Sequence, residues 1–429
     1  MFGRVLSFFL LAGAAGTASA AARPTQPIEP VEIPPSIQQG VDLIYIDPEI
    51  APQIAQRDRV LGEIGLENKL GTPVDLLVPM HPIYTDLRRG LARYRAAWSG
   101  LPQVQVPDGP LLKPGASGER VALLRQRLGL GAGDTYDEAL AKAVKRYQAA
   151  HGIKTDGVAG AGTLASLNLG AEHHERLIMI NLERARRLPA PSEKGRYILV
   201  DAGSARIYLY EDGKVRDSMK AIVGKAASAT PMMAAKLRYA SVNPYWNVPP
   251  DLVVKLIAPK VLSEGLKHIS DERYQILSDW TENPQEVDPA TIDWAAVAEG
   301  KTELRVRQLP GFRNSMGAIK FMMPNDFGIY LHDTPDKALF AKEDRWLSNG
   351  CVRVEDARRL ATWLFGAMPK GADPDAEEDV QLESAVPVYV TYLTVGAGAD
   401  GIAFRRDPYG RDPAVMARTF RTGPALTAR

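Results

Sequence analysis

The apolar pattern of this chain changes period near residue 197, and that change restricts the folds that the chain can adopt. Before it, apolar residues recur three and four positions apart, as in Val121, Leu124 and Leu128, which predicts helices. After it, residues 205–224 alternate apolar and polar side chains around Asp212-Gly213, a strong hairpin signal. We therefore predict an α+β multidomain chain with a helical N-terminal part and a mainly β C-terminal part.

The N-terminal part divides into four segments. Residues 1–20 carry Arg4, an apolar run and the small-x-small site Ala18-Ser19-Ala20, which fit a cleavable signal peptide. Residues 21–40 are rich in proline and are expected to form an extended arm. Residues 41–110 are expected to be a helical scaffold region, with a helix over "PIYTDLRRGLARYRAAW" capped by Thr85. Residues 111–170 are expected to form a small domain of three short helices, with a single core.

The C-terminal part begins after a connecting helix at residues 171–196. Residues 197–429 are expected to be mainly β, a β-sandwich with later strands at "GAIKFMMPN", "FGIYLH" and "VPVYVTYLTV". A helix is predicted from Val354 to Phe365. An acidic, helix-like stretch at about 251–306 interrupts the strands, and we interpret it as a capping insertion.

Cys351 is the only cysteine in the 429 residues. Exported chains usually use cysteines in disulfide pairs, and a lone thiol in an oxidising compartment is either inert and buried or reactive. With 52 basic and 51 acidic residues, the chain has no basic excess that would indicate a nucleic-acid partner. The lone thiol is therefore a candidate nucleophile.

The three-helix segment resembles the peptidoglycan-binding domain of cell-wall enzymes. The matching residues include Leu112, Gly115, Gly118, Val121, Leu124, Leu128, Tyr136, Val144, Tyr147, Gln148, Gly152, Asp156, Gly157, Gly160, Thr163 and Leu164. Whether this domain binds glycan or serves as a scaffold stays open. His173-His174 is not predicted to bind a metal, because adjacent helical positions point apart, and we expect a solvated face there.

A cysteine nucleophile needs a base and donors for an oxyanion. His332 ends a predicted strand 19 positions before Cys351 and is the candidate base. Gly350 allows close approach of the backbone, and its amide, together with that of Cys351, is a candidate oxyanion donor. The alternative from these residues alone is a core histidine and an inert thiol.

The motifs "YLHDTP" and "SNGCVRV" resemble the signature of the L,D-transpeptidase family, with its YkuD-type catalytic domain. The resemblance spans roughly residues 40 to 420, and the flanks resemble those of the long periplasmic members with a capping insertion. It implies that His332 deprotonates Cys351, which attacks the third residue of a peptidoglycan tetrapeptide stem. D-alanine leaves, and a second amine resolves the thioester into a 3→3 cross-link. The resemblance implies no metal or cofactor, and carbapenems as inhibitors.

Position 349 departs from the family pattern, which often has histidine there. Asn349 still donates and accepts hydrogen bonds, so the departure concerns the acceptor and the rate more than the reaction. Arg353 matches a family arginine, and it is expected either to anchor the loop or an acidic stem peptide, or to form a purely structural ion pair. Tyr330 is expected to face the same side as His332, and Trp246 either shapes the site or packs in a core.

Several alternatives remain open at this stage. A papain-like peptidase places its cysteine before its histidine, the reverse of the order here. Water as acceptor would make the protein an L,D-carboxypeptidase, and a lipoprotein amine would make it a lipoprotein-attaching transpeptidase. A catalytically inactive peptidoglycan-binding scaffold is the alternative from outside the enzymes.

Overall fold

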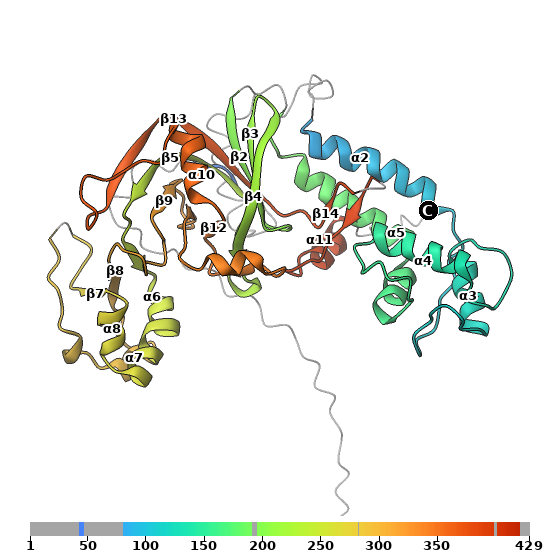
Figure 1. Cartoon of the computed structure of the whole chain (residues 1–429), viewed down its shortest axis with the longest axis horizontal. Helices are drawn as coiled ribbons and strands as arrows, with labels where there is room; N and C mark the ends of the chain where they lie inside the picture. Colours follow the sequence, from blue (N-terminus) through green and yellow to red (C-terminus); the bar gives the residue numbers. More distant parts are fainter. Residues whose placement is uncertain (1–42, 47–79, 191–194, 282, 399–400, 421–429) are drawn as a thin grey trace, which may run out of the picture.

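The computed structural model describes residues 43–46, 80–190, 195–281, 283–398 and 401–420 (Figure 1). The expected signal peptide at 1–20 and the arm at 21–40 lie outside the described residues. Within the described ranges, no helix is long and apolar enough to cross a membrane.

The N-terminal helix α2 (Pro82–Tyr94) continues into a π-helical turn, η3 (Arg95–Ser99). The predicted cap at Thr85 is wrong, because the helix begins earlier. His81 caps it through Nδ1, which accepts from the Ile83 amide at 3.1 Å, and Pro82 suits the first helical position. The side chains of Leu87, Leu91 and Tyr94 are buried, as their spacing predicts.

The three-helix domain consists of α3 (Glu119–Arg127), α4 (Glu138–Ala150) and the first half of α5 (Ala161–Ala185). Its core includes Val121, Leu124, Leu140 and Val144. Helix α5 kinks at Gly170, whose φ is 84°, so the predicted third helix and connecting helix are two halves of one element.

The motif residue Gln148 organises the end of this domain. Its amide nitrogen donates to Asp156 Oδ1 at 3.0 Å and to Thr163 Oγ1 at 3.2 Å, while its oxygen accepts from the Gly157 amide at 2.8 Å. Because Gln148 is buried, these bonds satisfy polar groups that would otherwise be costly. In this structure, these motif residues hold the domain together.

The mainly β part is built on a ten-stranded sheet that confirms the predicted α+β class. Its strands follow the order β1-β5-β13-β2-β3-β4-β12-β10-β9, with β11 on β4, and β9 also pairs with β5, so the sheet closes on itself. The strands are β1 (Leu43–Ile46), β2 (Arg196–Asp201), β3 (Arg206–Glu211), β4 (Lys214–Gly224), β5 (Met233–Val242), β9 (Ile319–Met322), β10 (Leu331–His332), β11 (Trp346–Ser348), β12 (Val352–Val354) and β13 (Glu378–Thr391).

Local chemistry explains where several of these strands begin and end. The β3–β4 hairpin turns at Asp212 and Gly213, with φ values of 50° and 73°, as a type I′ turn requires. In contrast, the predicted strand over 327–332 shrinks to β10, because the buried Asn325 side chain binds backbone groups of Met323, Phe327 and Ile329 and folds a turn instead.

Strand β2 is covered on both faces. Ile198 and Val200 face the interior of the closed sheet, which α10 (Ala357–Phe365) also lines. Tyr197 and Leu199 face outward into a second core, which α2 and α5 build with the short hairpin β14 (Val395–Gly396) and β15 (Ala403–Phe404). The helical part therefore packs directly on the sheet.

The C-terminal helix α11 (Asp412–Thr419) closes this junction. Arg184 of α5 binds Asp412 at 2.7 Å, and both side chains are buried. Asn181 of α5 donates to Thr394 Oγ1 at 2.9 Å. The expectation of a solvated His173-His174 face is wrong for His174, whose ring is buried in the same junction, with Nδ1 bound to the Gly170 carbonyl at 2.8 Å.

A cap subdomain, residues 246–308, projects from the other side of the sheet (Figure 1). It contains the strands β6 (Trp246–Val248), β7 (Tyr274–Leu277) and β8 (Arg305–Gln308) in the order β6-β8-β7. Its helices are α6 (Pro250–Leu252), α7 (Ala258–Glu264), α8 (Lys267–Asp271) and α9 (Trp294–Ala298), with short turns η5 (Val253–Ile257) and η6 (Pro289–Thr291). It has its own hydrophobic core. Two further short turns, η4 (Ala226–Ser228) and η7 (Lys337–Ala341), lie in the sheet part.

Candidate active site

The parallel pairing of β10 with β12 brings the predicted nucleophile and base together. His332 lies opposite Arg353, and the Val352 amide bonds the Tyr330 carbonyl at 3.1 Å, which places Cys351 beside Tyr330. Leu331 and Val352, between them, point into the core. Because side chains alternate along a strand, the other four share the opposite face. Cys351 and His332 are therefore diagonal neighbours on one surface.

The hydrogen bond of His332 fixes which ring nitrogen can act as a base. Nδ1 lies 2.6 Å from the Asp333 carbonyl oxygen. A carbonyl only accepts, so Nδ1 carries the proton and Nε2 holds the free lone pair. The backbone at Asp333 thus orients a neutral imidazole with its basic nitrogen available.

Three residues with basic side chains form a row across the sheet. In register, Lys320 of β9 lies beside His332, and His332 lies beside Arg353 of β12. Lys320 binds Glu377 at 3.0 Å and the Tyr245 carbonyl at 3.1 Å, and Arg353 contacts Asp336 at 3.5 Å. The histidine therefore sits between two cations.

These surroundings keep both reacting groups neutral at rest. Burial, followed by the charge of Arg353, lowers the pKa of His332 to about 3. Burial raises the pKa of the Cys351 thiol, although the Tyr330 amide and hydroxyl, Arg353 and Lys320 act in the opposite direction. The thiol itself lies near the Gly328 carbonyl, at 3.5 Å. The site is thus a neutral thiol–imidazole pair set in a positive environment that favours an anion.

The nucleophile sits on a tight turn held by side chains. Gly350 has a φ of 127°, a value that L-residues rarely adopt. The buried Ser348 hydroxyl accepts from the Gly350 amide at 3.2 Å and donates to the Cys351 carbonyl at 2.6 Å. The Gly350 amide, predicted as an oxyanion donor, is therefore already occupied in this structure. Among the described residues, no protein acceptor binds the Cys351 amide.

Thr230 clamps this turn to the sheet. It is fully buried, its hydroxyl donates to the Gly350 carbonyl at 2.7 Å, and it accepts from the Gly224 amide at 2.8 Å. Gly224 is also the register partner of Ser348, where β11 joins β4. One hydroxyl thus ties the end of β4 to the residue before the nucleophile.

The remaining predicted site residues lie in different surroundings. Tyr330 packs against the cap core, and its hydroxyl contacts Met316 Sδ at 3.3 Å. Its ring lies edge-on to His332, with 5.6 Å between the centroids. Asn349 is exposed at the turn. Trp246 lies in the cap core, in ring contact with Tyr274, which is the packing role rather than the site role.

Comparison with known proteins assigns this part of the chain. Residues 195–388 match the family model described as the L,D-transpeptidase catalytic domain, YkuD. They form an L,D-transpeptidase catalytic domain. Residues 117–167 match the family model described as "Putative peptidoglycan binding domain".

One curated relative and several solved structures are similar to this L,D-transpeptidase domain and its flanks. A Haemophilus influenzae protein named "Putative L,D-transpeptidase" is 33% identical over 242 residues, which cover 55% of this chain and 48% of that protein. The chain thus spans about half the length of this relative.

Among solved structures, an L,D-transpeptidase from Xylanimonas cellulosilytica is 18% identical, with 66% of this chain and 99% of that chain covered and a TM-score of 0.20. An L,D-transpeptidase from Mycobacterium smegmatis is 12% identical, with 46% of this chain and 58% of that chain covered and a TM-score of 0.23.

Three residues around the L,D-transpeptidase site were not identified from the sequence. Thr230 and Lys320 lie far from Cys351 in the chain, and strand pairing alone brings them to it. Ser348 lies inside the quoted motif, yet a serine before Asn-Gly indicates a turn without saying what its hydroxyl binds. Within the described ranges, no group of three or more His, Cys, Asp or Glu side chains could hold a metal ion.

Proposed function

We propose that this chain is a peptidoglycan L,D-transpeptidase that forms 3→3 cross-links through a thioester on Cys351, with His332 as general base. The observation that carries this proposal is the β10–β12 register, which makes the two side chains diagonal neighbours on one face. The Asp333 carbonyl supports it by leaving the Nε2 lone pair of His332 free.

In the first step, Cys351 Sγ attacks the carbonyl carbon of the third stem residue as its proton moves to His332 Nε2. The tetrahedral oxyanion forms where Arg353 and Lys320 already favour negative charge. The unbound Cys351 amide is the donor that we assign to it, in place of the Gly350 amide. The C–N bond then breaks, and D-alanine leaves with the proton from His332.

In the second step, an amine of a neighbouring stem attacks the thioester. His332 takes the amine proton, and the proton returns to the sulfur as the thiol leaves. Tyr330 and Arg353 border this face and are the residues that we expect to contact the stem, with the exposed Asn349 at its edge. Water or a lipoprotein amine in place of the stem amine gives the carboxypeptidase and the lipoprotein-attaching variants.

We also propose that the protein acts in the periplasm. The N-terminal pattern favours export to the periplasm, where peptidoglycan is accessible to a protein released by signal-peptide cleavage. The domain at 117–167 would keep the enzyme on its polymer substrate.

The test is incubation of the mature protein with disaccharide-tetrapeptide, followed by mass spectrometry. We expect a cross-linked dimer that has lost one D-alanine, and a thioester adduct on Cys351, both absent from Cys351→Ala. A tripeptide as the sole product would reassign the protein as an L,D-carboxypeptidase. Bound but unchanged substrate, with no adduct from a carbapenem either, would leave a wall-binding scaffold.

We predict that Thr230 positions Cys351 for catalysis by holding the Gly350 carbonyl. Thr230→Val keeps the shape of the side chain but leaves the buried Gly350 carbonyl and Gly224 amide without their partner. We expect a loss of about 1–3 kcal/mol of stability and a kcat lower by roughly 10- to 100-fold, with little change in KM, because the nucleophile is displaced rather than removed. Enzyme kinetics and thermal unfolding measure both.

Thr230→Ser is the matched control, because it retains the hydroxyl, and it should restore kcat to within a few-fold of the wild type. A Thr230→Val protein that is destabilised but keeps the wild-type kcat would show that Thr230 supports the fold without positioning Cys351.

A further inference from the structure

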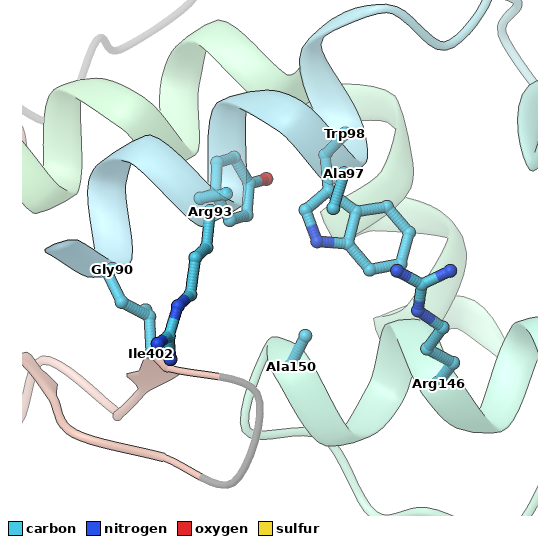
Figure 2. A pocket seen from close by; sticks show the side chains of 8 residues that line it. Gly90, Arg93, Ala97, Trp98, Arg146, Ala150 and Ile402 are labelled. Carbon is cyan, nitrogen blue, oxygen red and sulfur yellow. The ribbon is translucent and has the colours of Figure 1, made fainter.

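A cavity of about 210 Å³ opens at the junction between the helical part and the catalytic sheet, away from Cys351 (Figure 2). Side chains from three distant segments line it: α2 with η3, α4 and the residue just before β15. They include Arg93, Tyr94, Trp98, Arg146, Ala150 and Ile402. At about 30 Å³ per water molecule, its volume suits one sugar ring or one amino-acid residue.

The charged side chains that line this cavity are both positive. Figure 2 shows the guanidinium groups of Arg93 and Arg146 at its two edges. Among the residues that the structure describes, no acidic side chain lines it. In the part of the chain that the structure describes, neither arginine forms an ion pair with a carboxylate. Two unpaired guanidinium groups around one small cavity are suited to an anion, and to a carboxylate in particular.

An aromatic surface adjoins these charges. Trp98 borders the cavity from the π-helical turn η3, and the Arg146 guanidinium lies 5.3 Å from its ring centroid. π-Helical turns are uncommon and occur frequently at functional sites. This contact orients Arg146, and because Trp98 is only half-buried, the exposed part of its ring adds apolar surface for a sugar or side chain.

Tyr94, which lines the cavity, is held in place by buried neighbours. The Tyr94 hydroxyl binds His151 Nε2 at 3.0 Å, and the His151 ring stacks on Tyr147 at 3.7 Å and on Phe404 at 5.2 Å. All four side chains are buried. A preformed cavity loses little entropy on binding, which favours a specific ligand over transient counterions.

We propose that this junction cavity binds a single carboxylate-bearing unit of peptidoglycan, separately from the catalytic site. The identity of the ligand rests on the proposed function, whereas its chemistry rests on the arginines and the tryptophan. The carboxylate binds the guanidinium group of Arg93 or Arg146 at one edge of the cavity, and the flat face of the unit lies on Trp98. Because the cavity exists only when the helical part is docked on the β14–β15 hairpin, bound ligand also stabilises that docked arrangement.

The test measures binding to the full mature chain by calorimetry or NMR titration, with three probes. N-acetylmuramic acid carries the carboxylate on a sugar, a free stem tetrapeptide carries it on a peptide, and N-acetylglucosamine is the neutral matched sugar. We expect at least one acidic probe to bind ten times more tightly than N-acetylglucosamine and to raise Tm. The tighter of the two identifies the source of the carboxylate.

The charge variant R93Q/R146Q should weaken that probe at least tenfold, and Ala97→Leu, which fills the cavity without changing its charge, should do the same. The control R88Q/K142Q removes the same two charges from α2 and α4 outside the cavity lining, and should leave affinity unchanged. Equal affinity for the neutral sugar, or unchanged affinity in R93Q/R146Q, would overturn the proposal.

Measuring D-alanine release as well as probe binding tests the proposed function and the cavity independently. R93Q/R146Q should release D-alanine from a soluble disaccharide-tetrapeptide at the wild-type rate. Absence of D-alanine release from the wild type, with acidic probes still bound at this cavity, would refute the proposed function alone. Normal release without any probe binding would refute the cavity alone.

Discussion

Replacing His332 with glutamine is expected to slow acylation of Cys351 by roughly 10²- to 10⁴-fold, the usual contribution of a general base. Glutamine is similar in size but takes no proton from a thiol. The pKa of that thiol is raised by burial, so at neutral pH the variant depends on a minor thiolate population. Its residual rate should therefore rise about tenfold per pH unit up to the thiol pKa.

The wild type should behave differently over the same range. The pKa of His332 is lowered to about 3, so the neutral base is present throughout pH 5 to 8 and is lost only as pH falls towards 3. We expect kcat/KM for D-alanine release to be nearly flat between pH 5 and 8. His268→Gln, in the cap, is the matched control and should retain this profile. An acid limb near pH 6.5 in the wild type would contradict the neutral-pair site.

Mild acid is expected to loosen the junction between the helical part and the sheet. His81, His151 and His174 are buried there, and burial lowers their pKa values to about 4, 3 and 4. Each is bonded as a neutral ring: His81 to the Tyr197 hydroxyl, His151 to the Tyr94 hydroxyl, and His174 to the Gly170 carbonyl. Arg127 further disfavours a positive charge on His151 and His174.

Because the folded-state pKa values of these histidines are lowered, the protein loses stability as pH falls. Above pH 6.5 both the folded and the unfolded rings are neutral, and the full stability is present. As pH falls below 6.5, only the unfolded rings take up protons, and stability is lost until the folded pKa is reached. At pH 5 the loss is about 2 kcal/mol for each histidine.

Thermal unfolding at pH 7.5 and pH 5.0 measures this effect. We expect a large fall in Tm for the wild type, and a fall that is smaller by about 2 kcal/mol in free energy for His151→Phe. Phenylalanine keeps the ring between Tyr147 and Phe404 but does not titrate. His268→Gln should change nothing, because that ring is outside the junction. Identical pH dependence in His151→Phe and the wild type would show that His151 does not carry the effect.

The sequence predicted elements well where one periodicity controlled them. The stripe through Val121, Leu124 and Leu128 is buried as expected, because a helix buries its residues by spacing alone. Strand lengths were predicted less well. The predicted strand over 386–395 belongs to β13, which begins earlier, at Glu378, because its polar first half pairs with β5 regardless of burial.

Some residues around the site were likewise predicted from the sequence and others were not. Cys351 and His332 were predicted from a motif, whereas Lys320 and Thr230 were not, because their positions depend on strand register between distant segments. The occupied Gly350 amide depends on one rotamer of Ser348, which no sequence pattern specifies. Trp246 shows the converse: a suggestive aromatic near the motifs belongs to another core.

The double coverage of β2 determines how this chain can be divided into fragments. Consider a fragment that starts at residue 195, where the match to the catalytic family model begins. It would lack α2 and α5, so the side chains of Tyr197, Leu199 and Tyr210, which these helices cover, would be exposed to solvent. Such a fragment would be prone to self-association. The helical part therefore cannot be removed or exchanged without exposing this core. The smallest fragment suitable for crystallisation or inhibitor screening begins before α2.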